Sequence, residues 1–84
     1  MKIYWNGDSK NLIGPKLKQL RIKEGLSQAK LAARLQLLGM ECNDLTILRI
    51  EQGRRFVPDY EVSIIAKYFH ITTDELLGQM EAEQ

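Results

Sequence analysis

Residues 25–35 read GLSQAKLAARL, and this short stretch contains the end of one helix and the start of another. Gly25 suits the left-handed conformation with which many helices end. Ser27 is a favoured N-cap residue, so a second helix is expected to start directly after it. Apolar residues at helical spacing then mark its inward face, namely Leu31, Ala32, Leu35 and Leu38. The stretch predicts two helices joined by a tight turn.

The chain before this turn predicts the first helix. Gly14-Pro15 starts it, because proline is preorganised for the first helical position and needs no amide partner there. Leu17 and Leu20 then form its apolar stripe. Residues 1–13 show no helical period, so we expect them to form an irregular arm that contains at most one short strand.

Three more helices, the third of the chain a short one, are expected after the second helix, which Gly39 closes. Their signals are an N-cap at Asn43 or Asp44 and a stop at Gly53 for the third helix, a start at Asp59 for the fourth, and the capping-box pair Thr72 and Glu75 for the fifth. Their inward residues are Ile47, Ile50, Val62, Ile65, Ala66, Phe69, Leu76 and Leu77. The predicted fold class is therefore all-α, with five helices over residues 14–78 and a polar end at 79–84 that frays.

Composition narrows the classes of function. With 84 residues, 44% of them hydrophobic, the chain is the size of one globular domain. Its only cysteine, Cys42, and only histidine, His70, exclude a disulfide framework and predict neither a metal nor a cofactor. They also fail to supply the nucleophile, base and orienting group of an enzyme, so no catalytic residues or small-molecule substrate are expected. No apolar run reaches the roughly 18 residues of a membrane span, so we expect a cytoplasmic protein.

Charge is divided unevenly along the chain. Residues 1–34 contain eight lysines and arginines and two acidic residues, a net charge of +6. Residues 35–84 contain four basic and nine acidic residues, a net charge of −5. Such a division can present one basic face to a polyanion while the overall charge stays near zero. A solvated surface with a chance imbalance accounts for the charge equally well.

Short motifs follow one another along the chain in a characteristic order. They are Leu20-Arg21, Gly25-Leu26-Ser27-Gln28, Leu31-Ala32, Ile47, Arg49-Ile50-Glu51-Gln52-Gly53, Val57-Pro58 and Leu76-Leu77-Gly78. Each alone is weak, but together they resemble the phage-repressor (Cro/CI, XRE-like) helix-turn-helix family over about residues 14–78. The resemblance implies a five-helix lambda-repressor-like DNA-binding domain. Its second and third helices would form the helix-turn-helix, and the third would enter the major groove.

The resemblance also implies which residues face DNA. Gln28, directly after the Ser27 cap, would contact the DNA backbone or a base edge, and its amide can pair with adenine. The other predicted DNA-binding residues are Lys30 and Arg34 on the second helix, Asn43, Asp44, Leu45, Thr46, Leu48 and Arg49 on the third, and Arg54 and Arg55 in the loop after it. Gln28 can instead be a plain exposed residue, and the cations can be solvated surface charges. Arg21 and Glu51 are expected to form a buried structural pair.

The implied function is a duplex DNA-binding transcriptional regulator, a homodimer that represses by occupying its operator. Two departures from the family pattern bear on it. Residues 35–41 lengthen the connection between helices two and three, so we expect an extra turn on helix two and then a longer link. Asp44 would meet phosphates of like charge, and Leu45 and Leu48 can touch thymine methyl groups or form a protein-facing patch. The alternative is a protein-interaction module that keeps the fold without binding DNA.

Overall fold

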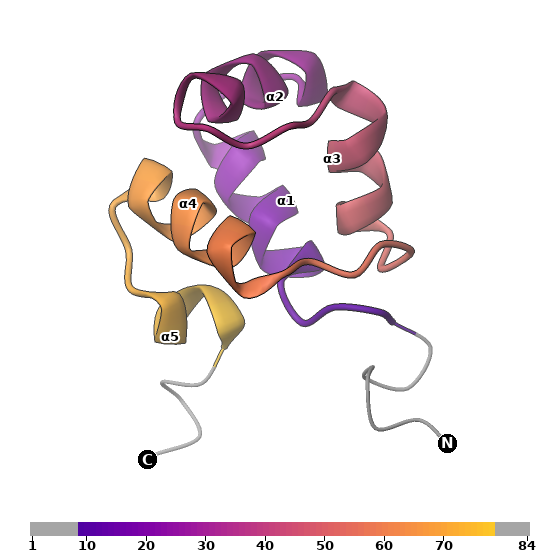
Figure 1. The fold of residues 1–84 in the computed structure, drawn as a ribbon, viewed down its shortest axis with the longest axis vertical. Helices are drawn as coiled ribbons and strands as arrows, with labels where there is room; N and C mark the ends of the chain where they lie inside the picture. The colour runs from indigo at the N-terminus through magenta and orange to yellow at the C-terminus, as the bar shows by residue number, and fades with distance from the viewer. Residues whose placement is uncertain (1–8, 79–84) are drawn as a thin grey trace.

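The computed structural model describes residues 9–78 of the chain. It contains five helices, α1 (Gly14–Lys23), α2 (Gln28–Leu37), α3 (Asp44–Glu51), α4 (Asp59–Phe69) and α5 (Thr73–Leu77). Figure 1 shows α1 running through the middle, with α2 above it, α3 on one side and α4 and α5 on the other. The predicted all-α class with five helices is confirmed. The predictions for residues 1–8 and 79–84 lie outside the described range.

The helices start at the residues that the sequence indicates. The Ser27 hydroxyl accepts a hydrogen bond from the Lys30 amide at 3.1 Å, and α2 begins directly after this cap. Asn43, rather than Asp44, caps α3, where its side chain forms a capping box with Thr46. At α5 the Thr72 hydroxyl accepts from the Glu75 amide at 3.0 Å. The N-terminal caps were therefore well predicted.

The ends of the helices follow one pattern with one unexpected residue. Gly25, Gly39 and Gly53 follow α1, α2 and α3, and all three have positive φ, as predicted. After α4 the same left-handed position is held by His70, with φ of 58° and ψ of 40°. A residue with a Cβ atom is sterically disfavoured in this conformation. The sequence pattern did not predict it for His70.

The core confirms most of the predicted inward residues. The apolar side chains buried in it are Ile13, Leu17, Leu26, Leu31, Ala32, Leu35, Met40, Ile47, Ile50, Ile65, Ala66 and Leu76. The prediction for Leu38 is wrong, because its side chain is 50% exposed. The chain reverses at Gly39, and the Met40 amide donates to the Leu35 carbonyl at 3.1 Å. Met40 therefore fills the place expected for Leu38.

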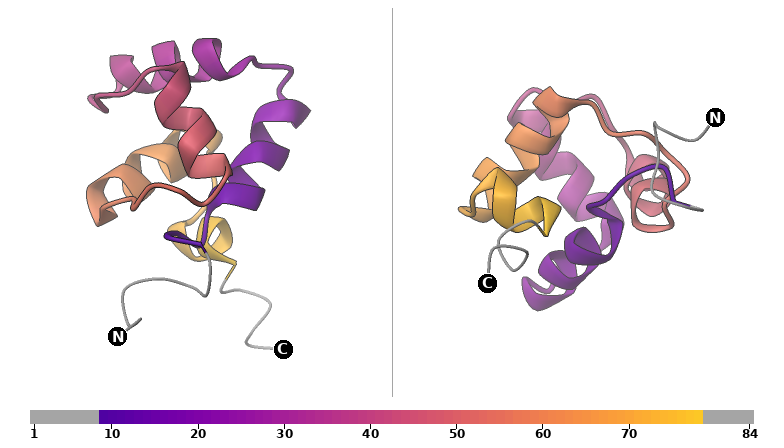
Figure 2. Two further views of the ribbon diagram at one scale, coloured as in Figure 1. Left: turned by 90° about the vertical axis from the view of Figure 1, so that its right-hand side faces the viewer. Right: turned by 90° about the horizontal axis from the view of Figure 1, so that it is seen from below.

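The connection between α2 and α3 spans residues 38–43. Cys42 packs against the core there, and burial raises the pKa of its thiol. The Gln36 side chain donates to the Cys42 carbonyl and ties the link to α2. In Figure 2, α3 descends steeply from α2, and α2 packs against α3 more extensively than against any other helix. The helices α2 and α3 therefore pack closely together although the link between them is lengthened.

Residues 9–13 belong to the packed domain although the sequence places them in the arm. Ile13 is buried, and the Lys10 amide donates to the Gly53 carbonyl at 2.8 Å. Asn11 donates to the carbonyls of Ile50 and Arg55 at 3.1 and 2.9 Å. The segment is therefore fastened to the end of α3.

None of the helices in the described part of the chain is long and apolar enough to cross a membrane.

Candidate nucleic-acid interface

The solvent-facing side of α3 is a single stripe of four residues. Ile47 and Ile50 face the core, so the opposite side of the helix carries the residues spaced by three and four positions, Leu45, Leu48, Arg49 and Gln52. Leu45 is 44% exposed, Arg49 and Gln52 are exposed, and Leu48 is half-buried. We call these four residues the α3 stripe. It mixes two apolar side chains with one cation and one amide, which suits contacts with both base edges and thymine methyl groups.

Three predicted DNA-binding residues, Asn43, Asp44 and Thr46, form hydrogen bonds at the start of α3. The Asn43 side-chain oxygen accepts from the Thr46 amide at 2.9 Å, and the Thr46 hydroxyl accepts from the Asn43 amide at 3.2 Å. The Asp44 carboxylate accepts from the Leu45 amide at 2.9 Å. Asn43 and Asp44 are exposed, and Thr46 is half-buried. These side chains are therefore engaged first in building the helix start.

A buried ion pair fixes α1, α2 and α3 to one another. Glu51 of α3 accepts from Arg21 Nε at 2.6 Å and from Nη2 at 3.1 Å, as predicted for this pair. The hydrogen bond with Glu51 raises the pKa of Arg21. Gln28, the first residue of α2, donates from Nε2 to Glu51 Oε1 at 3.1 Å. This hydrogen bond orients the side-chain amide of Gln28. The side-chain carbonyl oxygen of Gln28 can still accept a hydrogen bond from another group.

The two predicted cations of α2 lie in different settings. Lys30 is an exposed residue of the first helical turn. Arg34, one turn later, donates from Nη1 to the Tyr68 hydroxyl of α4 at 3.0 Å. The structure therefore links Arg34 to α4 while leaving its side chain exposed, and its contact with DNA stays a prediction.

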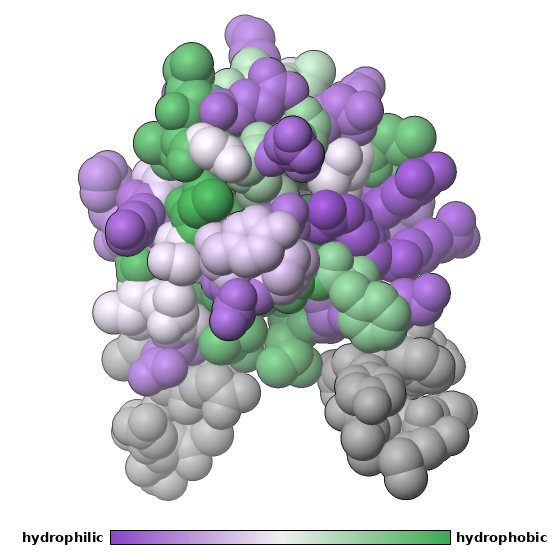
Figure 3. All heavy atoms as spheres, in the orientation of Figure 1, coloured by the Kyte–Doolittle hydropathy of each residue, from purple (hydrophilic) through white to green (hydrophobic). Residues whose placement is uncertain are grey.

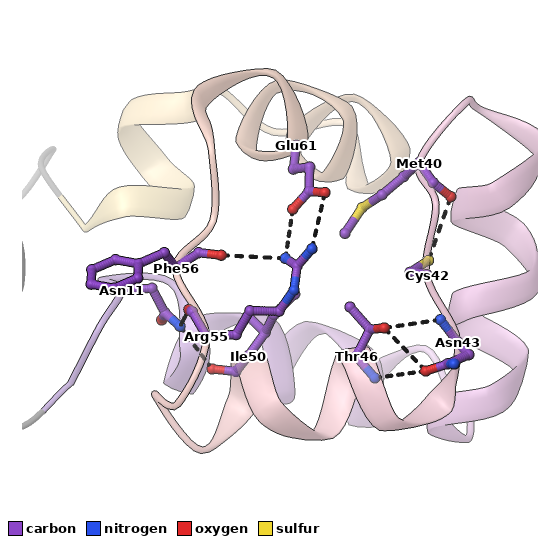
Figure 4. A network of polar contacts seen from close by, with 9 residues as sticks. All are labelled: Asn11, Met40, Cys42, Asn43, Thr46, Ile50, Arg55, Phe56 and Glu61. Carbon is purple, nitrogen blue, oxygen red and sulfur yellow. Dashed lines mark hydrogen bonds and ion pairs between the residues drawn. The ribbon is translucent and has the colours of Figure 1, made fainter.

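Arg55 is part of the interior framework and not a free cation. Its Nη1 and Nη2 donate to the two carboxylate oxygens of Glu61 at 2.7 and 3.3 Å. Glu61 is 4% exposed, and its hydrogen bond raises the pKa of Arg55. Figure 4 shows this guanidinium turned inward between the loop and α4. Glu61 thus neutralises the charge of Arg55, whose side chain is still 30% exposed, and the DNA contact predicted for Arg55 stays a prediction.

Arg54, the neighbour of Arg55, has the opposite setting. Its amide donates to the Arg49 carbonyl at 2.8 Å, and the Gly53 amide donates to the Ile50 carbonyl at 3.0 Å. This pair of bonds is a Schellman motif, in which the second residue after the C-cap usually makes an apolar contact. The corresponding residues after α1, α2 and α4 are Leu26, Met40 and Ile71.

Only after α3, among the helix ends described, is that place taken by an arginine, and Arg54 is exposed. The hydrogen bond from the Arg54 amide to the Arg49 carbonyl keeps the backbones of the two arginines close together. Hydrophilic side chains gather over α3 and the loop that follows it in Figure 3. Within residues 9–78, neither arginine forms an ion pair, so both remain available to an anion.

Three interactions that shape the site escaped sequence reasoning. They are the pairing of Arg55 with Glu61, the bond of Arg34 to Tyr68, and the bridging role of Asn11. The sequence did carry one signal for the first of them. Glu61 occupies a position on α4 that turns toward the core beside Ile65, and a carboxylate there requires a partner. Arg55 is a nearby cation in the chain that can meet this need.

Within the described residues, no three His, Cys, Asp or Glu side chains come together as a metal site.

A protein family described as a helix-turn-helix domain matches residues 12–77 of the chain. No curated protein and no solved structure matches it significantly. The match covers all five helices, and it starts before α1, in agreement with the packing of Ile13.

Proposed function

This chain belongs to the helix-turn-helix domain family, and from that membership we propose that it is a sequence-specific DNA-binding transcriptional regulator. The observation that carries the proposal is the α3 stripe, which includes the exposed Arg49, with a second exposed arginine, Arg54, just after the helix. In this assignment Leu45, Leu48 and Gln52 of the stripe contact base edges in the major groove, and Arg49 and Arg54 bind backbone phosphates. The proposed place of action is the cytoplasm.

The arrangement of α2 supports the same assignment. Gln28 lies at the helix N-terminus, where free amides and the helix dipole favour phosphate oxygens. Its side-chain amide is anchored by Glu51, so a contact made by Gln28 is in register with α3. Lys30 adds an exposed cation on the same turn. The proposed contact set is therefore Gln28 and Lys30 on α2, with Arg49 and Arg54 on α3 and its loop.

We further propose that the protein acts as a homodimeric repressor of the phage-repressor type. The motif order that resembles this group supports the proposal. Two copies would place their α3 helices about 34 Å apart, in successive major grooves of a partly palindromic operator. Repression would then be steric, because occupation of a promoter blocks polymerase without any chemical step.

The apolar members of the α3 stripe favour a second candidate function. Leu45 is exposed and Leu48 is half-buried on the same face, so α3 can also serve as a surface for another protein. This candidate predicts no salt-dependent binding to DNA. The two functions are therefore separated by one titration.

The test compares the affinity of the protein for duplex DNA at about 50 and 200 mM salt. Each phosphate contact contributes about 0.9 to the slope of log affinity against log salt, so an Arg49→Ala, Arg54→Ala double variant should lose roughly 1.8 from it. A Lys67→Ala variant is the matched control, since Lys67 is an exposed cation on α4. Binding that is indifferent to salt and to both arginines would reject DNA recognition and favour the protein-interaction module.

A further inference from the structure

The segment Ser9–Asn11 is fastened across the C-terminal end of α3, and we call it the N-terminal clasp. The Lys10 amide donates to the Gly53 carbonyl at 2.8 Å, and Asn11 Nδ2 donates to the carbonyls of Ile50 and Arg55 at 3.1 and 2.9 Å. The fit is close, because a Cβ atom on Gly53 would lie 2.5 Å from the Ser9 hydroxyl oxygen. Three carbonyls at and beyond the end of α3 thus receive hydrogen bonds from the clasp.

The clasp lies against the turn that follows α3. Gly53, which accepts the Lys10 amide, lies beyond the end of α3 with a φ of 75° and directly precedes Arg54. The Arg54 amide is bonded to the Arg49 carbonyl at 2.8 Å, and Lys10 is bonded to the residue directly before Arg54. The clasp therefore brings the backbone of Lys10 next to that of Arg54, which is itself bonded to the Arg49 carbonyl, although Lys10 and Arg54 are 44 positions apart in the chain.

The clasp also changes the charge at this end of α3. The C-terminal carbonyls of a helix carry partial negative charge, which repels a phosphate. Asn11 donates to one of these carbonyls, that of Ile50, and the Lys10 amide donates to the Gly53 carbonyl just beyond the helix. The exposed Lys10 side chain adds a full positive charge beside them. The ammonium lies 5.5 Å from the centre of the Phe56 ring, which holds it on the outside of the loop. An edge that would repel DNA becomes a cationic one.

We propose that Lys10 is a phosphate-contacting residue of the DNA interface, and that Asn11 is the positioning residue that holds it beside Arg49 and Arg54. The inference rests on the proposed DNA binding and extends it to the N-terminal clasp. The cationic edge then consists of Lys10, Arg49 and Arg54, contributed by two distant parts of the chain.

The experiment measures duplex DNA affinity of the full chain across a salt series for Lys10→Ala, Lys10→Arg and the control Lys67→Ala. Loss of one contact lowers the salt slope by about 0.9, so the affinity lost between about 50 and 200 mM salt should be some 3.5-fold smaller in Lys10→Ala than in the unchanged protein. Lys10→Arg should restore the slope. Lys67→Ala should leave it unchanged.

A double-mutant cycle tests the role of Asn11. If Asn11 positions Lys10, the effect of Lys10→Ala on the salt slope should shrink when Asn11→Ala is already present. Additive effects would show that Asn11 is only a structural residue. Thermal unfolding is measured for each variant. It identifies any loss of DNA binding that is caused by unfolding of that variant.

The outcomes separate this inference from the function on which it rests. If the Arg49 and Arg54 double variant reduces the salt slope while Lys10→Ala leaves it unchanged, the assignment of Lys10 is overturned and DNA binding stands. If binding is insensitive to salt for every variant and for the unchanged protein, the proposed function itself fails.

Discussion

Two adjacent arginines, Arg54 and Arg55, lie in opposite settings. Arg55 is paired with the buried carboxylate of Glu61, whereas Arg54 is exposed at the end of α3. We therefore expect Arg55 to contribute to stability and Arg54 to the proposed binding of DNA. The cause is the direction that each side chain takes as the chain leaves the Schellman motif, one toward α4 and one toward solvent.

We predict that Arg55→Ala lowers the free energy of unfolding by about 2–4 kcal/mol, because it leaves the Glu61 carboxylate buried without a partner. Arg54→Ala, the matched control, should change it by no more than about 0.5 kcal/mol, since it alters only an exposed side chain. Urea unfolding of the two variants measures both values. Equal losses in the two variants would contradict the division of roles.

Sequence patterns predicted residues whose partners are local, and missed those whose partners are distant. Ser27, Asn43 and Thr72 cap helices through amides three residues away, and each was found from sequence. Asn11 bonds to carbonyls 39 and 44 residues away, which no local pattern encodes. The Arg21–Glu51 pair was foreseen only through the family resemblance, because its partners lie 30 residues apart.

At the scale of elements, α4 ends differently from the three helices before it. His70 adopts the left-handed conformation that glycine takes after α1, α2 and α3. Its amide and that of Ile71 still form the closing hydrogen bonds, to Lys67 and Ala66. The turn into α5 is therefore held by the same bonds, at the additional cost of a Cβ atom in that conformation.

We predict that His70→Gly raises the free energy of unfolding by about 0.5–1 kcal/mol, because relief of the left-handed strain exceeds the entropy that glycine adds to the unfolded chain. His70→Ala is the control, because it removes the imidazole but keeps the Cβ atom. It should bring no such gain. Thermal unfolding compares the three proteins, and a gain in the alanine variant equal to that of glycine would assign the effect to the imidazole instead.

The elements of the helix-turn-helix were predictable as units, but their mutual packing was not. The bounds of α2 and α3 followed from Ser27, Gly39, Asn43 and Gly53. The lengthened link left their relative position open, because the pattern did not show that Met40 would replace Leu38 in the core. Because Met40 is buried and its amide is bonded to the Leu35 carbonyl, the link runs back along α2. The helix α3 then packs closely against α2.

For the whole molecule, the proposed interface is assembled from separate parts of the chain. The α3 stripe, Gln28 and the N-terminal clasp meet around α3, and the ion pair of Arg21 with Glu51 holds the three helices together beneath them. The basic half of the sequence supplies Lys10, Gln28 and Lys30, and the mainly acidic half supplies Arg49 and Arg54. Division of charge along the chain therefore does not translate directly into two faces of the fold.

Selection of bound sequences from a pool of random duplex DNA, carried out with the unchanged protein at low salt, tests the central claim most directly. Recognition by α3 predicts an enriched motif, and a homodimer predicts that the motif occurs twice with two-fold symmetry, with half-sites centred about 10 base pairs apart or a multiple of that spacing. A single unrepeated motif would retain recognition and reject the dimer. A pool that stays random after repeated rounds would contradict the claim that α3 reads DNA.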